Sequence, residues 1–197
     1  MYCYGISSRE NKMMTMMMTT TTTTTTMMIN DDVIAAYCEI EMTAHSSNEY
    51  LNYGYVKING DLVWHSAHGS GSILDRRGVS IIKVNPYSCS MVEIPRTYDT
   101  HVWDGHATEL SNYLQQLDSG TIIIGVTADE PTNHLQNALS SLTDMGVDVC
   151  DVTWKGAFSF VAQKDFPQKT VLRKSNVAGM PLNGQVKLSV RITGKVK

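Results

Sequence analysis

The sequence lacks both a strong excess of charge and any long apolar run. Sixteen Lys and Arg residues stand against nineteen Asp and Glu residues, a formal net charge of −3 over 197 residues. This near-balance gives no electrostatic reason to expect a nucleic acid as partner. No apolar run approaches the roughly 20 residues that a membrane-spanning helix needs, so we expect no membrane insertion. The length suits a single domain that can bury its own core.

A recognisable signal peptide is also missing. Residues 1–12 are polar, and residues 13–28 are almost wholly Met and Thr. A signal peptide needs a basic start, an apolar block and a small-residue cleavage site. We therefore predict that residues 1–30 are a disordered low-complexity head or a misread upstream exon. An O-glycosylated Thr-rich stalk is the alternative. Residues 31–197 are then predicted to form the single folded domain.

The four cysteines lack the CxxC spacing of a zinc ribbon or a thioredoxin-like motif. Cys3 lies in the head, and Cys150 lies in an apolar stretch where a buried thiol is the simplest interpretation. Cys38 and Cys89 both flank predicted turns. They are the preferred disulfide if the protein is secreted.

Alternating apolar residues predict several strands. Residues 53–58 and 61–65 both alternate and are joined by Asn59-Gly60, which is typical of a type I′ hairpin. Residues 121–127 have no polar face, so this strand should be central and covered on both sides. The other predicted strands cover residues 36–42, 78–85, 91–98, 147–152, 157–162 and 186–192.

Two segments have the apolar spacing of amphipathic helices. Residues 106–117 place leucines on one face, with Asp104 as a candidate N-cap and Gly120 beyond the end. Residues 132–144 form the second predicted helix, followed by Gly146. Strands and helices together predict an α+β fold.

The order of short motifs within these elements is more specific than any one of them. Arg77-Gly78 opens a strand, Tyr98-Asp99-Thr100 follows, and Asp129-Glu130-Pro131 comes directly after the apolar strand. An aromatic strand, Phe158-Ser159-Phe160-Val161, comes last. This arrangement resembles the ILEI/PANDER-type domain of the interleukin-like EMT inducer and pancreatic-derived factor group. The same domain occurs in the stem of protein O-mannose N-acetylglucosaminyltransferase.

The sequence departs from the family pattern at two places. Residues 187–197 contain no cysteine, although the cytokine-like members have one near the C-terminus. Trp154-Lys155-Gly156 stands where the family usually has Trp or Phe followed by Arg-Asp.

The resemblance implies a compact β-sandwich-like fold with two main flanking helices. It also implies a secreted or extracellular location, no cofactor and no enzymatic activity. Two functions are compatible with it. The first is lectin-like binding of a glycan or glycoprotein, as in the transferase stem. The second is that of a cytokine-like ligand that binds a cell-surface receptor.

By resemblance to the stem domain, Arg77, Asp129 and Lys155 are the predicted sugar contacts. A carboxylate can accept hydrogen bonds from neighbouring sugar hydroxyls, and an arginine can donate several. Lys155 in place of Arg keeps the charge but loses the planar fork. Asp129 also fits an N-cap for the helix beginning near Thr132, and the two roles are compatible.

Asp99 and Trp154 are further candidates for ligand binding. Asp99 is either part of the site or a turn residue that bonds its own backbone two residues on. Trp154 is either a stacking surface for a sugar ring or a partly buried core residue.

Some histidines have ligand-like spacing, in the sets His101, Asp104, His106 and His65, His68. A metal site needs three or four converging ligands with supporting groups around them. Nothing in the sequence indicates such convergence, so we expect no metal.

Overall fold

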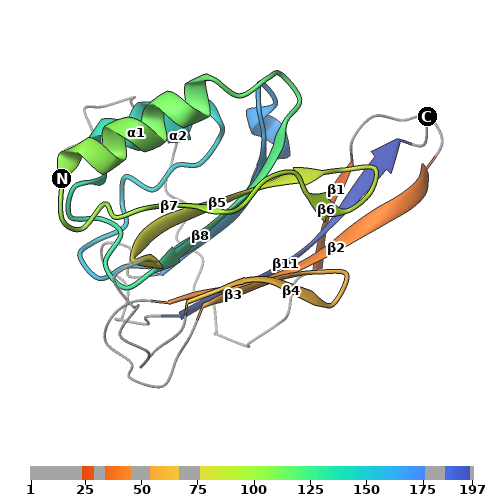
Figure 1. Cartoon of the computed structure of the whole chain (residues 1–197), viewed down its shortest axis with the longest axis horizontal. Coiled ribbons are helices and arrows are strands. Elements are labelled where there is room, and N and C mark those ends of the chain that lie inside the picture. The colour runs from red at the N-terminus through yellow and green to blue at the C-terminus, as the bar shows by residue number, and fades with distance from the viewer. Residues whose placement is uncertain (1–23, 29–33, 46–53, 67–75, 176–184, 196–197) are drawn as a thin grey trace, which may run out of the picture.

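The computed structural model describes residues 24–28, 34–45, 54–66, 76–175 and 185–195. Two β-sheets pack face to face, and the helices cover the outer face of the second sheet (Figure 1). The predicted α+β, β-sandwich-like fold with flanking helices is confirmed. No helix among these residues combines the length and the apolar character needed to cross a membrane.

The first sheet has the strand order β1-β11-β2-β3-β4. Its long central pair is antiparallel, and β1 runs parallel to β11. The strands are β1 (Thr24–Met28), β11 (Gln185–Lys195), β2 (Ile34–His45), β3 (Tyr55–Ile58) and β4 (Asp61–His65). Asn59 and Gly60 both have positive φ, 52° and 87°, which confirms the predicted I′-like hairpin between β3 and β4.

The second sheet has the order β10-β9-β8-β5-β6, with β7 also paired to β5. Its strands are β10 (Val171–Lys174), β9 (Phe158–Gln163), β8 (Ile122–Ala128), β5 (Gly78–Asn85), β6 (Ser90–Met91) and β7 (Arg96–Tyr98). All seven residues of β8 are buried and β8 is central. The prediction of a central strand covered on both sides is therefore correct.

Two apolar clusters lie on opposite faces of the second sheet. Ile122, Ile124 and Val126 of β8 join the cluster between the sheets. Ile123 joins the cluster under the helices, beside Phe158 and other residues of β9. Because successive side chains of β8 point to opposite faces, this one strand packs against both the first sheet and the helices.

The first helix, α1 (Asp104–Gln115), buries the leucine face that its periodicity predicts, including Leu110 and Leu114. The predicted cap by Asp104 is wrong. Trp103 is the N-cap residue and makes no side-chain capping bond. Asp104 is instead the first helical residue, and its Oδ1 accepts hydrogen bonds from His134 (2.6 Å) and Gln136 (2.8 Å).

The second helical region is shorter than predicted. It consists of the 3₁₀ turn η2 (Leu135–Ala138) and α2 (Leu139–Asp144), whereas the sequence predicts a helix from residue 132. A further 3₁₀ turn, η3 (Pro167–Lys169), precedes β10. Gly146 has the positive φ, 79°, expected just past a helix end.

Three other expectations differ from the structure. The strand predicted over residues 147–152 is absent, and its apolar residues pack into the helix-side cluster from an irregular segment. The strand predicted over residues 91–98 is divided into β6 and β7. The end of the Met/Thr segment, predicted to be disordered, forms β1, and residues 1–23 lie outside the described residues.

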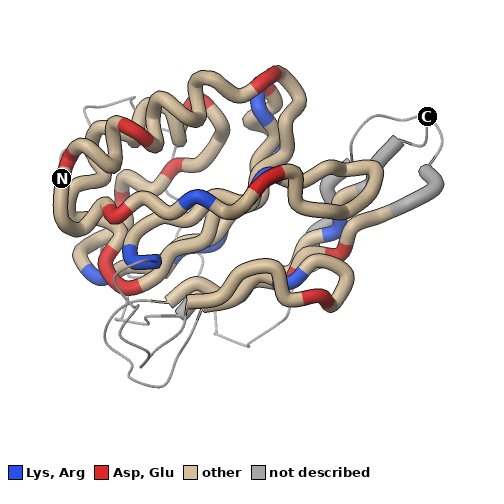
Figure 2. The backbone as a smooth tube through the Cα atoms, in the orientation of Figure 1, with Lys and Arg blue, Asp and Glu red and all other residues tan. Residues whose placement is uncertain are grey.

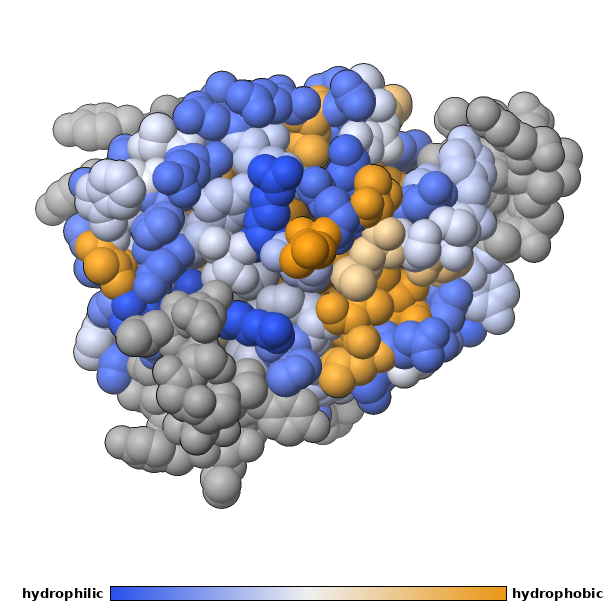
Figure 3. Space-filling model, viewed as in Figure 1, coloured by the Kyte–Doolittle hydropathy of each residue, from blue (hydrophilic) through white to orange (hydrophobic). Residues whose placement is uncertain are grey.

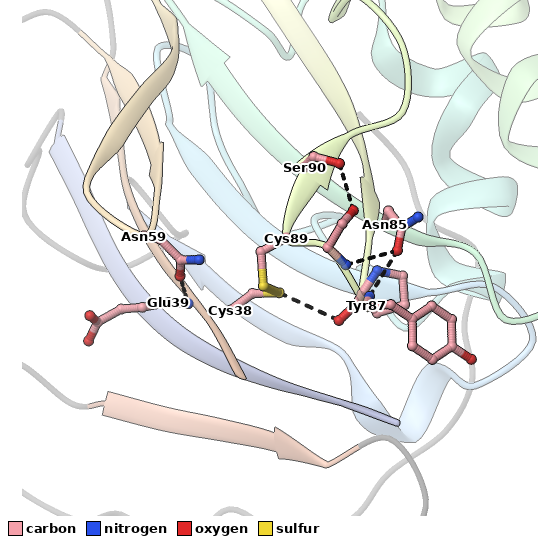
Figure 4. Close-up of a disulfide and its surroundings, with 9 residues drawn as sticks. Cys38, Glu39, Asn59, Asn85, Tyr87, Cys89 and Ser90 are labelled. Atoms are coloured by element: carbon pink, nitrogen blue, oxygen red, sulfur yellow. Dashed lines mark hydrogen bonds between the residues drawn. A yellow bond between two sulfur atoms is a disulfide. The ribbon is translucent and has the colours of Figure 1, made fainter. Parts of the chain in front are cut away.

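A disulfide between Cys38 and Cys89 joins the two sheets, as predicted (Figure 4). Cys38 is fully buried on β2, and Cys89 lies in the turn between β5 and β6. Asn85 organises this turn, because its Oδ1 accepts hydrogen bonds from the backbone N–H groups of Tyr87 and Ser88. The prediction of a buried thiol at Cys150 is wrong, since Cys150 is disulfide-bonded too. Cys3 lies outside the described residues.

A polar network fastens the segment between β6 and β7 to α1. Glu93 accepts hydrogen bonds from Tyr113 Oη (2.7 Å) and Arg96 Nη2 (3.1 Å). The Arg96 guanidinium also lies 4.6 Å from the centre of the Tyr113 ring. The bond from Tyr113 and, to a smaller extent, Arg96 lower the pKa of Glu93, against the opposing effect of burial.

Removing the inter-sheet disulfide should lower the free energy of unfolding without changing the fold. The two cysteines are 51 residues apart, and loop-closure entropy for such a loop corresponds to about 4 kcal/mol. Urea unfolding of Cys38→Ala/Cys89→Ala, compared with the unaltered protein, measures this loss. A change below about 1 kcal/mol would contradict the role assigned to the bond.

Glu93 should make stability depend on pH in the acid range. Its pKa is lower in the folded state than the ordinary 4.5, so its contribution is present above about pH 4.5 and is lost as pH falls. The difference in unfolding free energy between pH 7 and pH 3 should therefore shrink in Glu93→Gln. Asp118→Asn, which alters an exposed carboxylate, is the control. Equal pH dependence in both variants would argue against the network.

Candidate functional site

Strand register brings three predicted site residues to one end of the second sheet. Gly78 pairs with Ala128, and Val79 pairs with Tyr98. Arg77 comes just before Gly78, whereas Asp99 comes just after Tyr98 and Asp129 just after Ala128. The three residues therefore meet where β5 begins and where β7 and β8 end. Figure 2 shows acidic and basic residues side by side at this end of the molecule.

The close meeting of β5 and β7 requires a glycine at residue 78. Gly78 has a φ of 96°, and a Cβ there would lie 2.1 Å from the carbonyl oxygen of Tyr98. No side chain fits in that space. The glycine thus allows the residues that flank it, Arg77 and those after Tyr98, to approach each other.

Arg77 and Asp99 form a forked ion pair with little exposure to solvent. Arg77 Nε donates to both carboxylate oxygens (3.0 and 3.2 Å), and Nη2 donates to Oδ2 (2.8 Å). Asp99 Oδ1 also accepts the backbone N–H of His101 at 3.3 Å. The turn predicted at Asp99 is therefore confirmed, and the same carboxylate orients Arg77.

The surroundings favour the charged form of Arg77. Hydrogen bonding to Asp99 raises the pKa of Arg77, while burial acts in the opposite direction. The negative charges of Asp99 and, more weakly, Asp129 raise it further. Arg77 is thus a fixed cation between two carboxylates.

Asp129 directly follows β8 and has a left-handed backbone conformation, with a φ of 59°. Its predicted role as a helix cap is wrong, because the nearest helical turn begins at Leu135 with His134 as its N-cap residue. Among the described residues, no side chain or backbone group hydrogen-bonds the Asp129 carboxylate. Its oxygens can therefore accept hydrogen bonds from a ligand.

Glu130 is a member of this site that the sequence interpretation missed. It is only 3% exposed. Its carboxylate accepts hydrogen bonds from Thr132 N (2.8 Å), from Thr132 Oγ1 (2.5 Å) and from the backbone N–H of Lys155. The available signal was a second acidic residue, two positions after the end of a fully apolar strand.

Lys155 and Trp154 lie on a turn that Glu130 connects to the end of β8. Lys155 has a φ of 59°, and its Nζ lies 4.4 Å from the centre of the Trp154 ring. Of the two alternatives for Trp154, the partly buried core residue is wrong, because the residue is 64% exposed. Lys155 lies over one face of this exposed indole, so a sugar ring would have to stack on the other face or displace Lys155.

The two loops beside the site are held together by hydrogen bonds. Thr100 Oγ1 donates to the Pro131 carbonyl (2.7 Å), and Asn133 Nδ2 donates to the His101 carbonyl (2.9 Å). The backbone N–H of His134 donates to the Thr100 carbonyl at 2.8 Å. Arg77, Asp99, Asp129, Trp154 and Lys155 thus belong to connected strand ends and loops.

Two of the residues considered as metal ligands, His106 and Asp104, have other partners. His106 Nδ1 lies 3.3 Å from Glu109, and His134 Nδ1 lies 2.6 Å from Asp104. The described part of the chain contains no group of three or more His, Cys, Asp or Glu residues arranged to hold a metal. His68 lies outside the described residues.

Comparison with known families supports the expected relationship. Residues 77–166 match the family model described as Interleukin-like EMT inducer. The matched segment runs from the residue before β5 to beyond β9 and contains all five predicted ligand-binding residues. No curated protein sequence matches the chain. The predicted resemblance is therefore confirmed over this segment.

Replacing Asp99 should separate its contribution to the ion pair from its contribution to the turn. Asp99→Asn can keep the bond to the His101 backbone but loses its charge, which we expect to cost about 1–2 kcal/mol of unfolding free energy. Asp99→Ala loses both contributions and should cost more. Chemical denaturation measures both effects.

Asp151→Asn is the control, because Asp151 forms an exposed pair with Lys174. Such pairs contribute at most about 1 kcal/mol. If Asp99→Asn costs no more than Asp151→Asn, the Arg77–Asp99 pair is not the rigid element described.

Proposed function

We propose that the protein binds a carbohydrate. The proposal starts from residues 77–166, which are an ILEI-type domain. At the level of the family, such a domain is a cytokine-like module. The binding is non-enzymatic and takes place outside the cell. The family match and the Cys38–Cys89 disulfide are compatible with an extracellular protein. The partner is a glycan or a glycoprotein.

One observation carries this proposal: the half-buried Asp129 and the Arg77 cation lie at one end of the second sheet, and Glu130 links this end to the turn with the exposed Trp154. Sugars present neighbouring hydroxyls, which donate to a carboxylate and accept from a guanidinium. Asp99 holds two of the nitrogens of Arg77, which leaves other N–H donors for a ligand. The apolar face of a pyranose ring can stack on Trp154.

Lys155 contributes a cation without the planar fork of an arginine. Its ammonium group can donate to hydroxyls but cannot form two parallel bonds to one diol. We therefore expect weaker binding than the arginine of the family pattern would support. Reintroducing that residue by Lys155→Arg is expected to strengthen saccharide binding.

A protein receptor is the second candidate partner, and the apolar surface favours it. Figure 3 shows apolar surface gathered over the side where the β5–β6 turn lies near the β3–β4 hairpin. The exposed apolar residues of the hairpin and of the chain from the β5–β6 turn to β7 are Leu62, Tyr87, Met91, Val92 and Ile94, and Ile94 is 86% exposed. Exposed apolar residues that gather in one place are typical of protein contacts. The β5–β6 turn lies at the other end of β5 from Gly78, which pairs with Ala128 next to Asp129.

The test is calorimetric titration of the full chain with saccharides that end in β-linked N-acetylglucosamine, alongside other sugars. Binding that weakens at least about tenfold in Asp129→Asn supports the proposal, since this corresponds to one or two lost charged hydrogen bonds. Asp144→Asn, an exposed carboxylate beyond the site, should bind like the unaltered protein.

Two outcomes would contradict carbohydrate binding at this site. One is a well-folded protein that binds no sugar of the panel. The other is saccharide affinity unchanged by Asp129→Asn. Cell-surface binding that free sugar does not compete with, and that Val92→Ser/Ile94→Ser abolishes, would support the receptor as partner instead.

A further inference from the structure

Glu130 is the one fully buried carboxylate in the described part of the chain. Both of its oxygens are engaged within the protein. One accepts the N–H and the hydroxyl of Thr132, and the other accepts the backbone N–H of Lys155. Glu130 therefore connects the loop after β8 with the turn that carries Trp154 and Lys155. The two segments are 25 residues apart in the chain.

The residues on either side of this connection both have unusual backbone conformations. Asp129 and Lys155 each have a φ of 59°, a region that residues other than glycine rarely adopt. Such conformations persist when surrounding contacts hold them. The bond from Lys155 N to Glu130 orients the Lys155 peptide directly. Asp129 is covalently adjacent to the same buried side chain.

Packing leaves the Lys155 turn little room on its other side. A Cβ at Gly156 would lie 2.3 Å from Val152 Cγ1 and 2.9 Å from the Ser175 carbonyl. The Gly156 N–H donates to the Thr153 carbonyl at 2.9 Å. Packing around Gly156 and the hydrogen bond between Lys155 N and Glu130 thus both restrain the turn.

We propose that Glu130 is a positioning residue that fixes Asp129 and the Trp154–Lys155 turn relative to each other, without touching the ligand itself. Only a carboxylate suits this place, because all three of its partners are donors. A glutamine would turn an NH₂ donor toward another donor. An aspartate would be one methylene shorter. The effect on ligand affinity rests on the proposed function, whereas the effect on the turn does not.

Amide hydrogen exchange, measured by NMR on the full chain, tests the effect on the turn. In Glu130→Gln we expect the Lys155 amide to exchange at least ten times faster, while amides of β8 keep their protection. Thr132→Val is the matched control. It removes one bond to the same carboxylate but leaves the bond to Lys155, so the exchange of the Lys155 amide should change less than twofold.

Saccharide titration of the same variants tests the effect on recognition. We expect Glu130→Gln to weaken binding of an N-acetylglucosamine-terminated saccharide at least fivefold, with less than a twofold change in Thr132→Val. If Glu130→Gln does not fold, Glu130→Asp takes its place with the same expectations. Unchanged Lys155 exchange in the folded variant would overturn the proposal.

The two proposals fail in distinguishable ways. If Glu130→Gln binds the saccharide normally while Asp129→Asn does not, carbohydrate binding stands and the positioning role is refuted. If the unaltered protein binds no saccharide, the proposed function is refuted. The exchange of the Lys155 amide then decides alone whether Glu130 holds the turn.

Discussion

The burial of β8 on both faces is the constraint on which the rest of the structure depends. Its residues point alternately into the cluster between the sheets and into the cluster under the helices. Because neither face can be left in water, the strand requires the first sheet on one side and α1 with α2 on the other. The disulfide between Cys38 and Cys89 then connects the first sheet to the turn after β5.

The candidate site is a consequence of where this apolar strand ends. Immediately after Ala128 the chain has two carboxylates, and the structure gives them opposite environments. Glu130 turns inward and is satisfied by Thr132 and Lys155, whereas Asp129 is half-buried and its charge acts on Arg77. A rigid sheet therefore carries the loops whose side chains are available to a ligand, the arrangement typical of binding sites on β-rich scaffolds.

The periodicity of the sequence correctly predicted the elements in which buried side chains also belong to hydrogen-bonded strands, such as β5, β8 and the Asn59-Gly60 hairpin. It failed for residues 147–152, where valines are buried but the backbone forms no strand, because an apolar pattern reports burial and not hydrogen-bond pairing. The second helix begins late because Pro131, Asn133 and His134 are bonded to the loop at Thr100 and His101. Such long-range bonds leave no local signal. The site residues Arg77, Asp99 and Asp129 could be named from motifs, yet the inward turn of Glu130 and the exposure of Trp154 could not.

The most direct measurement is to record the backbone amide NMR signals of the full chain during titration with a β-N-acetylglucosamine-terminated saccharide. Binding at the end of β8 predicts shifts for residues 99–101, 129, 130, 132 and 153–156. Amides of the β3–β4 hairpin and the β5–β6 turn should stay unchanged. Shifts confined to those two turns, or no shifts at all in a well-dispersed spectrum, would contradict a carbohydrate site at Arg77 and Asp129.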